Sequence, residues 1–221
     1  MIIRHRLSDS LVFILLLGLL LNGCRKENFI PVSGLITDPN QAIPVAGVNV
    51  EIWTQQIESG IFSANYILAG TIITGSDGKF LLNLENENYT GIRLIFSKEG
   101  YFGWETDLNL DLVKNDHRYF AEYQLLPKAT LQIRVKNSKP YNSDDYFEFR
   151  ILNGYSVCEA CCKGEKYQFA GMDIDLTIDC QTVGHQNIIF QWSKRKNGEQ
   201  IFKTEIHFIK AFETTVIRFD F

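Results

Sequence analysis

The chain has 221 residues, with 22 Lys and Arg against 26 Asp and Glu, a net charge of −4, and 13% aromatic residues. This mildly acidic balance argues against nucleic acid as a partner, because phosphate binding depends on clustered Lys and Arg. A hydrophobic content of 45%, with 16 Phe, excludes a disordered chain, since so much apolar surface can fill a core.

The first predicted element is a short apolar run behind a basic start. Arg4 and Arg6 precede residues 11–21, which are apolar apart from one Gly. About eleven residues are too few to cross a bilayer core of roughly 30 Å as a helix, which needs about 20. The pattern therefore predicts a signal peptide over residues 1–23, with a short membrane helix or an ordinary cleaved signal as the alternative.

The apolar run ends in Leu21, Asn22, Gly23 and Cys24. This segment resembles the lipobox of bacterial lipoproteins, in which Leu, a small residue and Gly or Ala precede an obligatory Cys; Asn22 departs from it. The resemblance implies cleavage before Cys24 and lipidation of Cys24, so that residues 24–30 become a tether and the membrane a partner. Each buried methylene contributes about 0.8 kcal/mol, so several acyl chains would hold the protein firmly on the membrane. We expect an outer-membrane lipoprotein of the cell envelope, facing the periplasm or the cell surface.

Beyond Pro31 the apolar runs are short, rich in Val, Ile, Phe and Tyr, and bounded by Gly, Asn, Asp or Pro. Residues 48–52, 108–112 and 174–178 alternate apolar with polar side chains, which is typical of a strand with one buried face. No segment after the signal keeps a helical period. The predicted strands cover residues 31–37, 46–54, 66–74, 79–84, 91–98, 105–112, 118–126, 130–136, 145–152, 172–179, 186–195, 200–210 and 212–220.

Strands at this spacing, without intervening helices, predict an all-β protein of two consecutive antiparallel β-sandwiches. We place the first domain at residues 31–127 and the second at 128–221, because Pro127 lacks the N–H that a sheet ladder needs. A single larger sandwich is the alternative. The polar residues 54–66 predict a long hairpin loop, either solvated or functional.

Turn signals in the first domain are, in chain order, Gly34, Asp38, Pro44, Gly47, Asp77 and Gly78. Gly34 lets the first strand bend or be approached closely, and Pro44 stiffens the start of the second strand. Gly78 supplies the positive φ that a hairpin turn needs.

These turns lie in segments that resemble the carboxypeptidase regulatory-like domain, a transthyretin (prealbumin)-like sandwich common in surface and secreted proteins of the Bacteroidetes. The family's patterns G-x-V-x-D, P-L-x-G-V-x-V and T-D-x-x-G-x-F correspond to residues 34–38, 44–50 and 74–80, and residues 98–102 resemble its Tyr-bearing stretch. The resemblance covers residues 30–127 and implies a transthyretin-like fold. It implies no peptidase activity, because in metallocarboxypeptidases this module is an appendage to a separate catalytic domain.

The sequence contains no recognisable catalytic motif. None of the four His residues has the spacing of a metallopeptidase site. Residues 154–158 match the nucleophile elbow of hydrolases only in part, because Cys158 stands where its second Gly is required. We therefore predict no enzyme, no cofactor and no resident metal.

Besides Cys24, the chain has four cysteines, at Cys158, Cys161, Cys162 and Cys180. An even number in an oxidising compartment indicates two disulfides. Adjacent Cys161 and Cys162 point to opposite sides of an extended chain, so we expect one of them to pair with Cys180 and the other with Cys158. A zinc site of four thiolates and partly free thiols are the alternatives.

Other polar and aromatic residues are weaker candidates. Asp144, Asp145 and the alternating aspartates of residues 173–179 could bind calcium, or mark turns and a solvated strand face. Trp53 and Trp104 are either core residues or exposed platforms for sugar stacking. Aromatic residues at strand spacing are expected in the core: Phe147, Phe149, Phe190, Trp192, Phe202 and Phe208.

The predicted function is that of a membrane-anchored, non-catalytic binding or assembly module of the cell envelope, with a protein or a glycan as ligand. The alternative is an accessory subunit of an outer-membrane complex for nutrient or polysaccharide uptake, since related modules precede outer-membrane receptors. That alternative predicts a membrane partner that co-purifies.

Overall fold

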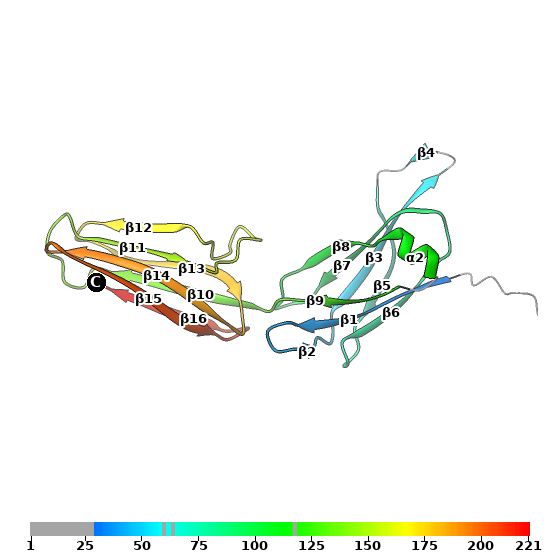
Figure 1. The fold of residues 1–221 in the computed structure, drawn as a ribbon, viewed down its shortest axis with the longest axis horizontal. Helices are drawn as coiled ribbons and strands as arrows, with labels where there is room; N and C mark the ends of the chain where they lie inside the picture. The colour runs from blue at the N-terminus through cyan, green and yellow to red at the C-terminus, as the bar shows by residue number, and fades with distance from the viewer. Residues whose placement is uncertain (1–28, 59–60, 63–64, 117–118) are drawn as a thin grey trace, which may run out of the picture.

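The computed structural model describes residues 29–58, 61–62, 65–116 and 119–221. Cys24, the signal peptide and the tether up to residue 28 lie outside the described residues. Strands dominate the described part and form two β-sandwiches that follow one another along the chain and lie end to end (Figure 1). The predicted all-β fold of two consecutive sandwiches is confirmed.

The first sandwich packs two sheets, ordered β6-β1-β9 and β5-β3-β7-β8, with the short β2 beside β1 and the short β4 beside β3. Between β8 and β9 lies helix α2 (Leu110–Asp116). The strands are β1 (Phe29–Asp38), β2 (Ile43–Pro44), β3 (Asn49–Glu58), β4 (Ile61–Phe62), β5 (Ile67–Ile73), β6 (Lys79–Glu85), β7 (Tyr89–Ser97), β8 (Trp104–Asp107) and β9 (Tyr119–Gln124).

The alternation of buried and more exposed side chains along the strands defines the core of the first sandwich. Val32 and Ile36 in β1 have no exposed surface, and they face Val50 of β3 and Leu94 of β7 across one apolar cluster. Gly34 lies at a close approach: a Cβ there would come within 2.7 Å of the Ala121 carbonyl oxygen. The missing side chain therefore lets β9 and the core rings pack against β1.

Three expectations for the first sandwich are wrong in part. Residues 108–112 are not one strand, because the Asn109 side chain caps α2 by accepting hydrogen bonds from the N–H groups of Asp111 (2.9 Å) and Leu112 (3.4 Å). β3 extends through Glu58, so much of the expected 54–66 loop is strand. The sandwich is also not wholly antiparallel, because β9 pairs with β1 in parallel.

The second sandwich packs the sheets β13-β10-β16 and β12-β11-β14-β15. Its strands are β10 (Lys128–Lys136), β11 (Tyr146–Ile151), β12 (Lys166–Ala170), β13 (Asp175–Val183), β14 (Gln186–Lys196), β15 (Glu199–Ile209) and β16 (Thr214–Asp220). Leu131, Ile133 and Val135 of β10 face Phe147 and Phe149 of β11 in its core. The hydrophobic clusters of the two sandwiches are separate, one ending at Leu125 and the other beginning at Ala129.

Three details of the second sandwich also differ from expectation. Strand β12 was not predicted, and β10 pairs with β16 in parallel. Phe202 and Phe208 are not core residues: 68% and 58% of their surface is exposed, because they lie on the outer face of the edge strand β15. The core assignment holds for Phe147, Phe149 and Phe190, which are buried, and Trp192 is partly buried.

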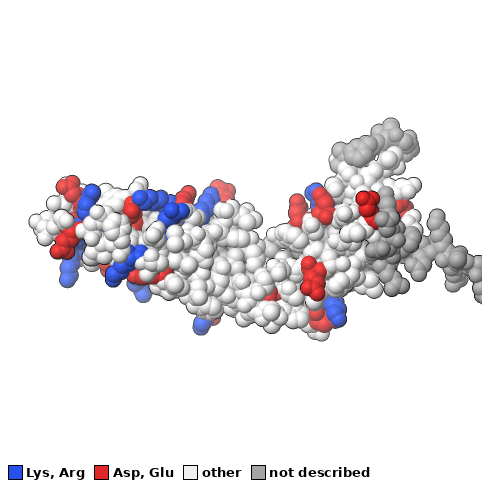
Figure 2. All heavy atoms as spheres, viewed as in Figure 1, with Lys and Arg blue, Asp and Glu red and all other residues white. Residues whose placement is uncertain are grey.

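The two sandwiches differ in charge. Residues 31–127 contain 5 basic and 12 acidic residues, a net charge of −7, whereas residues 128–221 contain 13 and 12, a net charge of +1. Figure 2 shows Lys and Arg mainly over the second sandwich, and few charged atoms around the junction in this view.

Candidate functional site

The chain between the sandwiches is hydrogen-bonded to both of them. The Phe102 N–H donates to the Leu126 carbonyl (2.9 Å), and the Lys128 N–H to the Gly100 carbonyl (2.7 Å). On the other side, the Gly184 N–H donates to the Pro127 carbonyl (2.8 Å). The connection is therefore a paired segment rather than a free linker.

A small apolar cluster fills the junction. Phe102 of the first sandwich is buried against Val183 and Cys161 of the second, and its ring lies 4.6 Å from that of Tyr155 between centroids. Leu126 packs against the same group. The junction therefore has its own hydrophobic contacts, distinct from the two cores.

Disulfides shape the second sandwich's side of the junction. Cys158 pairs with Cys161, and Cys162 pairs with Cys180 of β13. The predicted pairing is confirmed, and the zinc alternative is wrong because all four sulfurs are in disulfides. The loop between β11 and β12 is held further where the Tyr155 N–H donates to the Cys162 carbonyl (2.8 Å).

Next to this cluster lies a cleft of about 630 Å³ between the first sandwich and the disulfide loop. Its size is within the range of small-molecule sites. The first sandwich contributes the start of β8 and the end of β9, and the second contributes the disulfide loop. The lining residues are Phe102, Gly103, Trp104, Glu122, Tyr123, Gln124, Leu126, Tyr155 and Val157.

Trp104 is the largest exposed aromatic group of the cleft. Its ring stacks on that of buried Phe96, with centroids 5.6 Å apart and planes 14° apart, and lies 5.7 Å from the ring of Tyr123. Even so, 44% of Trp104 is exposed. Packing thus fixes the indole while leaving part of it open to a ligand. Trp53, the other Trp left open by the sequence, is only partly exposed, and its Nε1 donates to Glu51 (2.9 Å).

The polar groups of the cleft are few. Glu122 and Gln124 are exposed on β9, where their side chains can accept and donate hydrogen bonds. Burial raises the pKa of Tyr155 and that of Tyr123 above the ordinary value. Both phenols therefore stay neutral at physiological pH, and Glu122 is the single carboxylate among the lining residues.

The turn residues singled out in the sequence lie away from the cleft, with one link to the junction. Buried Asp38 accepts a hydrogen bond from the Asn40 N–H (2.9 Å), and its Oδ2 lies 3.5 Å from His185 Nδ1 of the second sandwich. The Asn40 side chain donates to the Gly184 carbonyl (2.9 Å). The turn at Asp38 and Asn40, which the sequence analysis assigned to the first sandwich alone, therefore also contacts the second sandwich at the junction.

The other turn residues serve the first sandwich alone. Gly47 and Gly78 have φ values of 68° and 71°, and a Cβ on Gly78 would lie 2.6 Å from the Ile36 carbonyl oxygen. Pro44 of β2 pairs with Thr37 of β1, and the Asp77 side chain accepts a hydrogen bond from the Lys79 N–H (3.1 Å).

Sequence reasoning named Trp104 but missed the rest of the cleft. Glu122 and Gln124 carry no motif, and Tyr155 and Val157 lie in the segment 154–158, whose partial match to a nucleophile elbow did not point to a binding site. Only the fold and the disulfides bring the four residues together. Within the described ranges, no group of three or more His, Cys, Asp or Glu is placed to hold a metal ion. Nor does the described part of the chain contain a helix long and apolar enough to cross a membrane.

Comparison with known proteins gives no family. No family model matches the chain, and no curated protein matches it. Solved structures to which the chain is similar include a streptococcal ancillary pilin (TM-score 0.35, 12% identity, 87% of this chain and 62% of that one). Others are the shaft pilin SpaA of Lactobacillus rhamnosus GG (TM-score 0.30, 10% identity, 86% and 96%) and the major pilin SpaD of Corynebacterium diphtheriae (TM-score 0.35, 8% identity, 81% and 65%). The chain thus spans less than two thirds of the streptococcal and corynebacterial pilins.

Proposed function

We propose that this protein is a non-catalytic binding module of the cell envelope, and that it holds its ligand in the junction cleft. The observation that supports this most is Trp104, which lines the cleft and is fixed against Phe96 yet 44% exposed. A rigid, partly exposed aromatic face provides contact area at low entropic cost.

The chemistry of the lining favours a glycan. The apolar face of a sugar ring stacks on an indole, while its hydroxyls need both donors and acceptors nearby. Glu122 accepts, Gln124 does both, and the neutral phenol of Tyr155 adds a further donor and acceptor. The small number of polar groups within an aromatic wall suits an uncharged, hydroxyl-rich ligand.

The same lining argues against glycoside hydrolysis, which uses a pair of carboxyl groups flanking the scissile bond. Glu122 is the single carboxylate among the residues that line the cleft, and these residues include no Ser, Cys, His or Lys to act as a nucleophile. The cleft is therefore suited to binding rather than to turnover.

The test is glycan binding by the purified protein, first on a glycan array and then by calorimetry with the best ligand. Val157→Arg is the sharpest variant, because Val157 is 72% exposed and a long charged side chain there obstructs the cleft without disturbing a core. We expect V157R and Trp104→Ala each to weaken binding at least tenfold, about 1.4 kcal/mol.

The matched control is Trp53→Ala, which removes a partly exposed Trp of the same sandwich outside the cleft. Its affinity should equal that of the wild type. Glycan binding that survives V157R and W104A unchanged would place the ligand elsewhere and contradict the proposal. Binding of peptides but not glycans would retain the cleft and reject the ligand class.

We also propose that Cys24 is the lipid anchor. The lipobox-like segment before it supports this, as does an apolar run too short to span a bilayer. Replacing Cys24 by Ser should abolish incorporation of labelled palmitate and leave residues 1–23 uncleaved, which the mass of the intact protein would show. Unchanged labelling would contradict the anchor. A membrane protein that co-purifies with the wild type would favour the accessory-subunit alternative.

We further propose that residues 30–127 are related to the carboxypeptidase regulatory-like domain. The support is the spacing of residues 34–38, 44–50 and 74–80 around the two turn glycines Gly47 and Gly78. An experimental structure of the protein, superposed on members of that family, tests the relation. A different strand order would reject it.

A further inference from the structure

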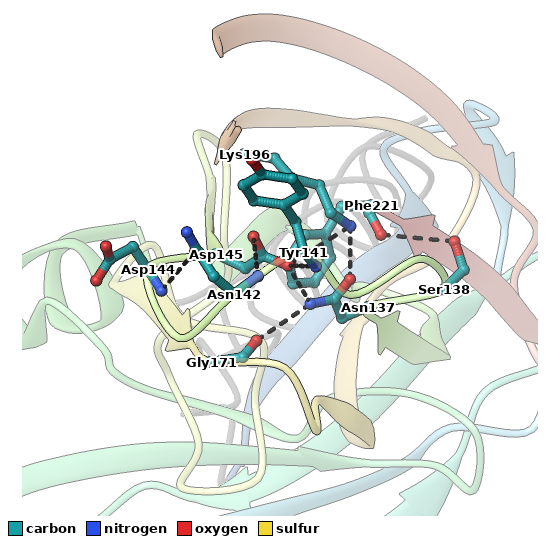
Figure 3. Close-up of polar contacts among 9 residues, drawn as sticks. All are labelled: Asn137, Ser138, Tyr141, Asn142, Asp144, Asp145, Gly171, Lys196 and Phe221. Carbon is teal, nitrogen blue, oxygen red and sulfur yellow. Dashed lines mark hydrogen bonds and ion pairs between the residues drawn. The ribbon is translucent and has the colours of Figure 1, made fainter. Parts of the chain in front are cut away.

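At the end of the second sandwich far from the junction, three polar side chains meet in a buried cluster (Figure 3). Asn137 follows β10, Asp145 precedes β11, and Lys196 is the last residue of β14. Asn137 is 5% exposed and Asp145 fully buried, and 18% of the Lys196 side chain is exposed. Such a group is nearly dry, and its members interact strongly.

The distances within this cluster connect all three groups. The Lys196 Nζ donates to the Asn137 Oδ1 at 2.6 Å, and the Asn137 Nδ2 donates to the Asp145 Oδ2 at 2.9 Å. The same carboxylate oxygen lies 3.7 Å from the Lys196 Nζ. One oxygen of Asp145 is thus close to both the amine of the lysine and the amide nitrogen of the asparagine.

The surroundings hold these groups in place. The Asp145 carboxylate also accepts hydrogen bonds from the N–H groups of Tyr141 (2.8 Å) and Asn142 (3.4 Å). The Asn137 amide donates a second bond to the Gly171 carbonyl (3.1 Å). Burial alone would raise the pKa of Asp145, but the hydrogen bonds from Tyr141, Asn137 and Asn142 lower it below its ordinary value, so Asp145 rests as a carboxylate.

We propose that Lys196 and Asn137 become joined by an intramolecular amide bond, with Asp145 moving the proton. The bond that forms links the Lys196 Nζ to the Asn137 Cγ, and the bond that breaks is the Asn137 Cγ–Nδ2 bond. Ammonia leaves. The step is an acyl transfer without oxidation or reduction, so it requires no co-reactant.

The position of Asp145 matches the proton movements that the step requires. Its Oδ2 first takes a proton from the Lys196 ammonium, which frees the nitrogen lone pair for attack. Attack then requires the amine to move from Oδ1, which it already contacts, to the carbon bonded to that oxygen. Finally the same Oδ2 returns this proton to Nδ2, to which it is already hydrogen-bonded, so that nitrogen leaves as ammonia. The attacking nitrogen loses its second proton through Oδ2 as the amide forms, and the departing ammonia takes that proton to become ammonium.

The link would connect the two sheets of the second sandwich. Asn137 extends the sheet of β10, Lys196 ends a strand of the other sheet, and 59 positions separate them in the sequence. A covalent cross-link over such a distance limits the unfolded chain, and it would do so at the end opposite to the disulfides.

Peptide mass spectrometry of the purified full chain tests the proposal directly. After reduction, denaturation and trypsin digestion, we expect one peptide pair that joins the segments containing Asn137 and Lys196. Its mass should be lower than the sum of the two by one ammonia, and trypsin should not cut after Lys196. Recovery of the two segments only as separate, full-mass peptides from folded wild-type protein would overturn the proposal.

The variants separate this reaction from its alternatives. Lys196→Arg keeps the positive charge beside Asp145 but removes the nucleophile, and Asp145→Asn keeps the shape but removes the base; both should lack the joined peptide. Lys194→Arg, on the same strand two residues earlier, should retain it. A joined peptide that persists in K196R would reject the assignment.

A second source of ammonia loss must be distinguished. Asn197 precedes Gly198, and such pairs can close to a succinimide within one chain segment. That product loses the same mass but joins no second peptide, and Asn197→Gln would prevent it. An ammonia loss confined to the Asn197 peptide, absent in N197Q, would overturn the cross-link; a joined peptide in N197Q would support it.

Discussion

The two sandwiches share a design but not the means of holding it together. Each has a parallel pair that joins an early strand to its last one, β1 with β9 and β10 with β16. In the described part of the first, a continuous apolar core and close backbone packing at Gly34 dominate. The second adds two disulfides at the junction and buried polar groups at its far end.

This difference suggests that the two sandwiches carry different tasks. The first carries a net charge of −7, follows the proposed anchor and presents Trp104 to the cleft. The second supplies the other wall of that cleft from a disulfide-held loop. A binding wall built on a loop needs covalent support. A wall built on strands is held instead by the hydrogen bonds of its sheet.

The largest effect is expected when the disulfide between Cys162 and Cys180 is removed. Changing both to Ser should destabilise the second sandwich by about 3 kcal/mol, because the bond closes a segment of 18 positions. Hydrogen exchange read by mass spectrometry should show lost protection in β10–β16 and none in β1–β9. Changing Cys158 and Cys161, only 3 positions apart, is the matched control and should cost less. Equal losses in both sandwiches would refute the division.

The next test acts on the first sandwich alone. Gly34→Ala should cost about 2 kcal/mol of unfolding free energy, because its Cβ would lie 2.7 Å from both the Ala121 carbonyl oxygen and the ring of Phe80. Gly103→Ala is the control, since its nearest neighbour is 3.5 Å away. Denaturant titration gives both values. A neutral G34A would show that β1 and β9 can separate without cost.

Acid should act mainly on the second sandwich. The Glu148 carboxylate lies 2.6 Å from both the Lys166 Nζ and the Tyr146 hydroxyl. Burial opposes its charged form, but these partners outweigh burial and lower its pKa from 4.5 to about 2. Because the folded-state pKa is depressed, the stabilisation is fully present above about pH 4.5 and is lost as the pH falls towards 2. We expect a loss of about 2 kcal/mol, allowing for partial exposure.

Denaturant titrations from pH 6 to 2 measure this effect, with Glu148→Gln as the control that should remove the pH-dependent part. In the first sandwich, the Arg93–Asp107 pair also lowers the pKa of Asp107, but both side chains are exposed and solvent weakens the pair. A wild type and an E148Q variant with the same acid profile would contradict the prediction.

The smallest effect concerns the junction. Asn40→Ala removes the hydrogen bond to the Gly184 carbonyl and should cost about 1 kcal/mol. The core of each sandwich should remain intact, while the relative orientation of the two becomes more variable. Residual dipolar couplings measured by NMR report this directly. An unchanged orientation would show that the Phe102 cluster alone fixes the junction.

Local patterns predicted much of this fold. Alternation at Val48, Val50 and Ile52 identified β3, and the even number of cysteines led to the disulfide pairing. The same rule failed at residues 108–112, where leucines at every second position match a strand equally well. Capping by Asn109 and the packing of Val113 select a helix instead.

The missed features depend on contacts that no local pattern contains. Phe202 and Phe208 alternate as core residues do, yet their strand is at a sheet edge with their side chains on its outer face. Tyr155 and Val157 reach the cleft because a disulfide positions their loop. The cluster of Asn137, Asp145 and Lys196 joins residues up to 59 positions apart, which only the folded sandwich brings together.

The parallel pairings have a mechanical consequence. The chain begins β1 at Phe29 and leaves β9 after Gln124, and it begins β10 at Lys128 and leaves β16 after Asp220. Tension between the two ends of the described chain would therefore pull each parallel pair along the strand axis, in shear. Because the bonds of such a pair resist together rather than opening one after another, both sandwiches should withstand stretching better than a hairpin that peels apart.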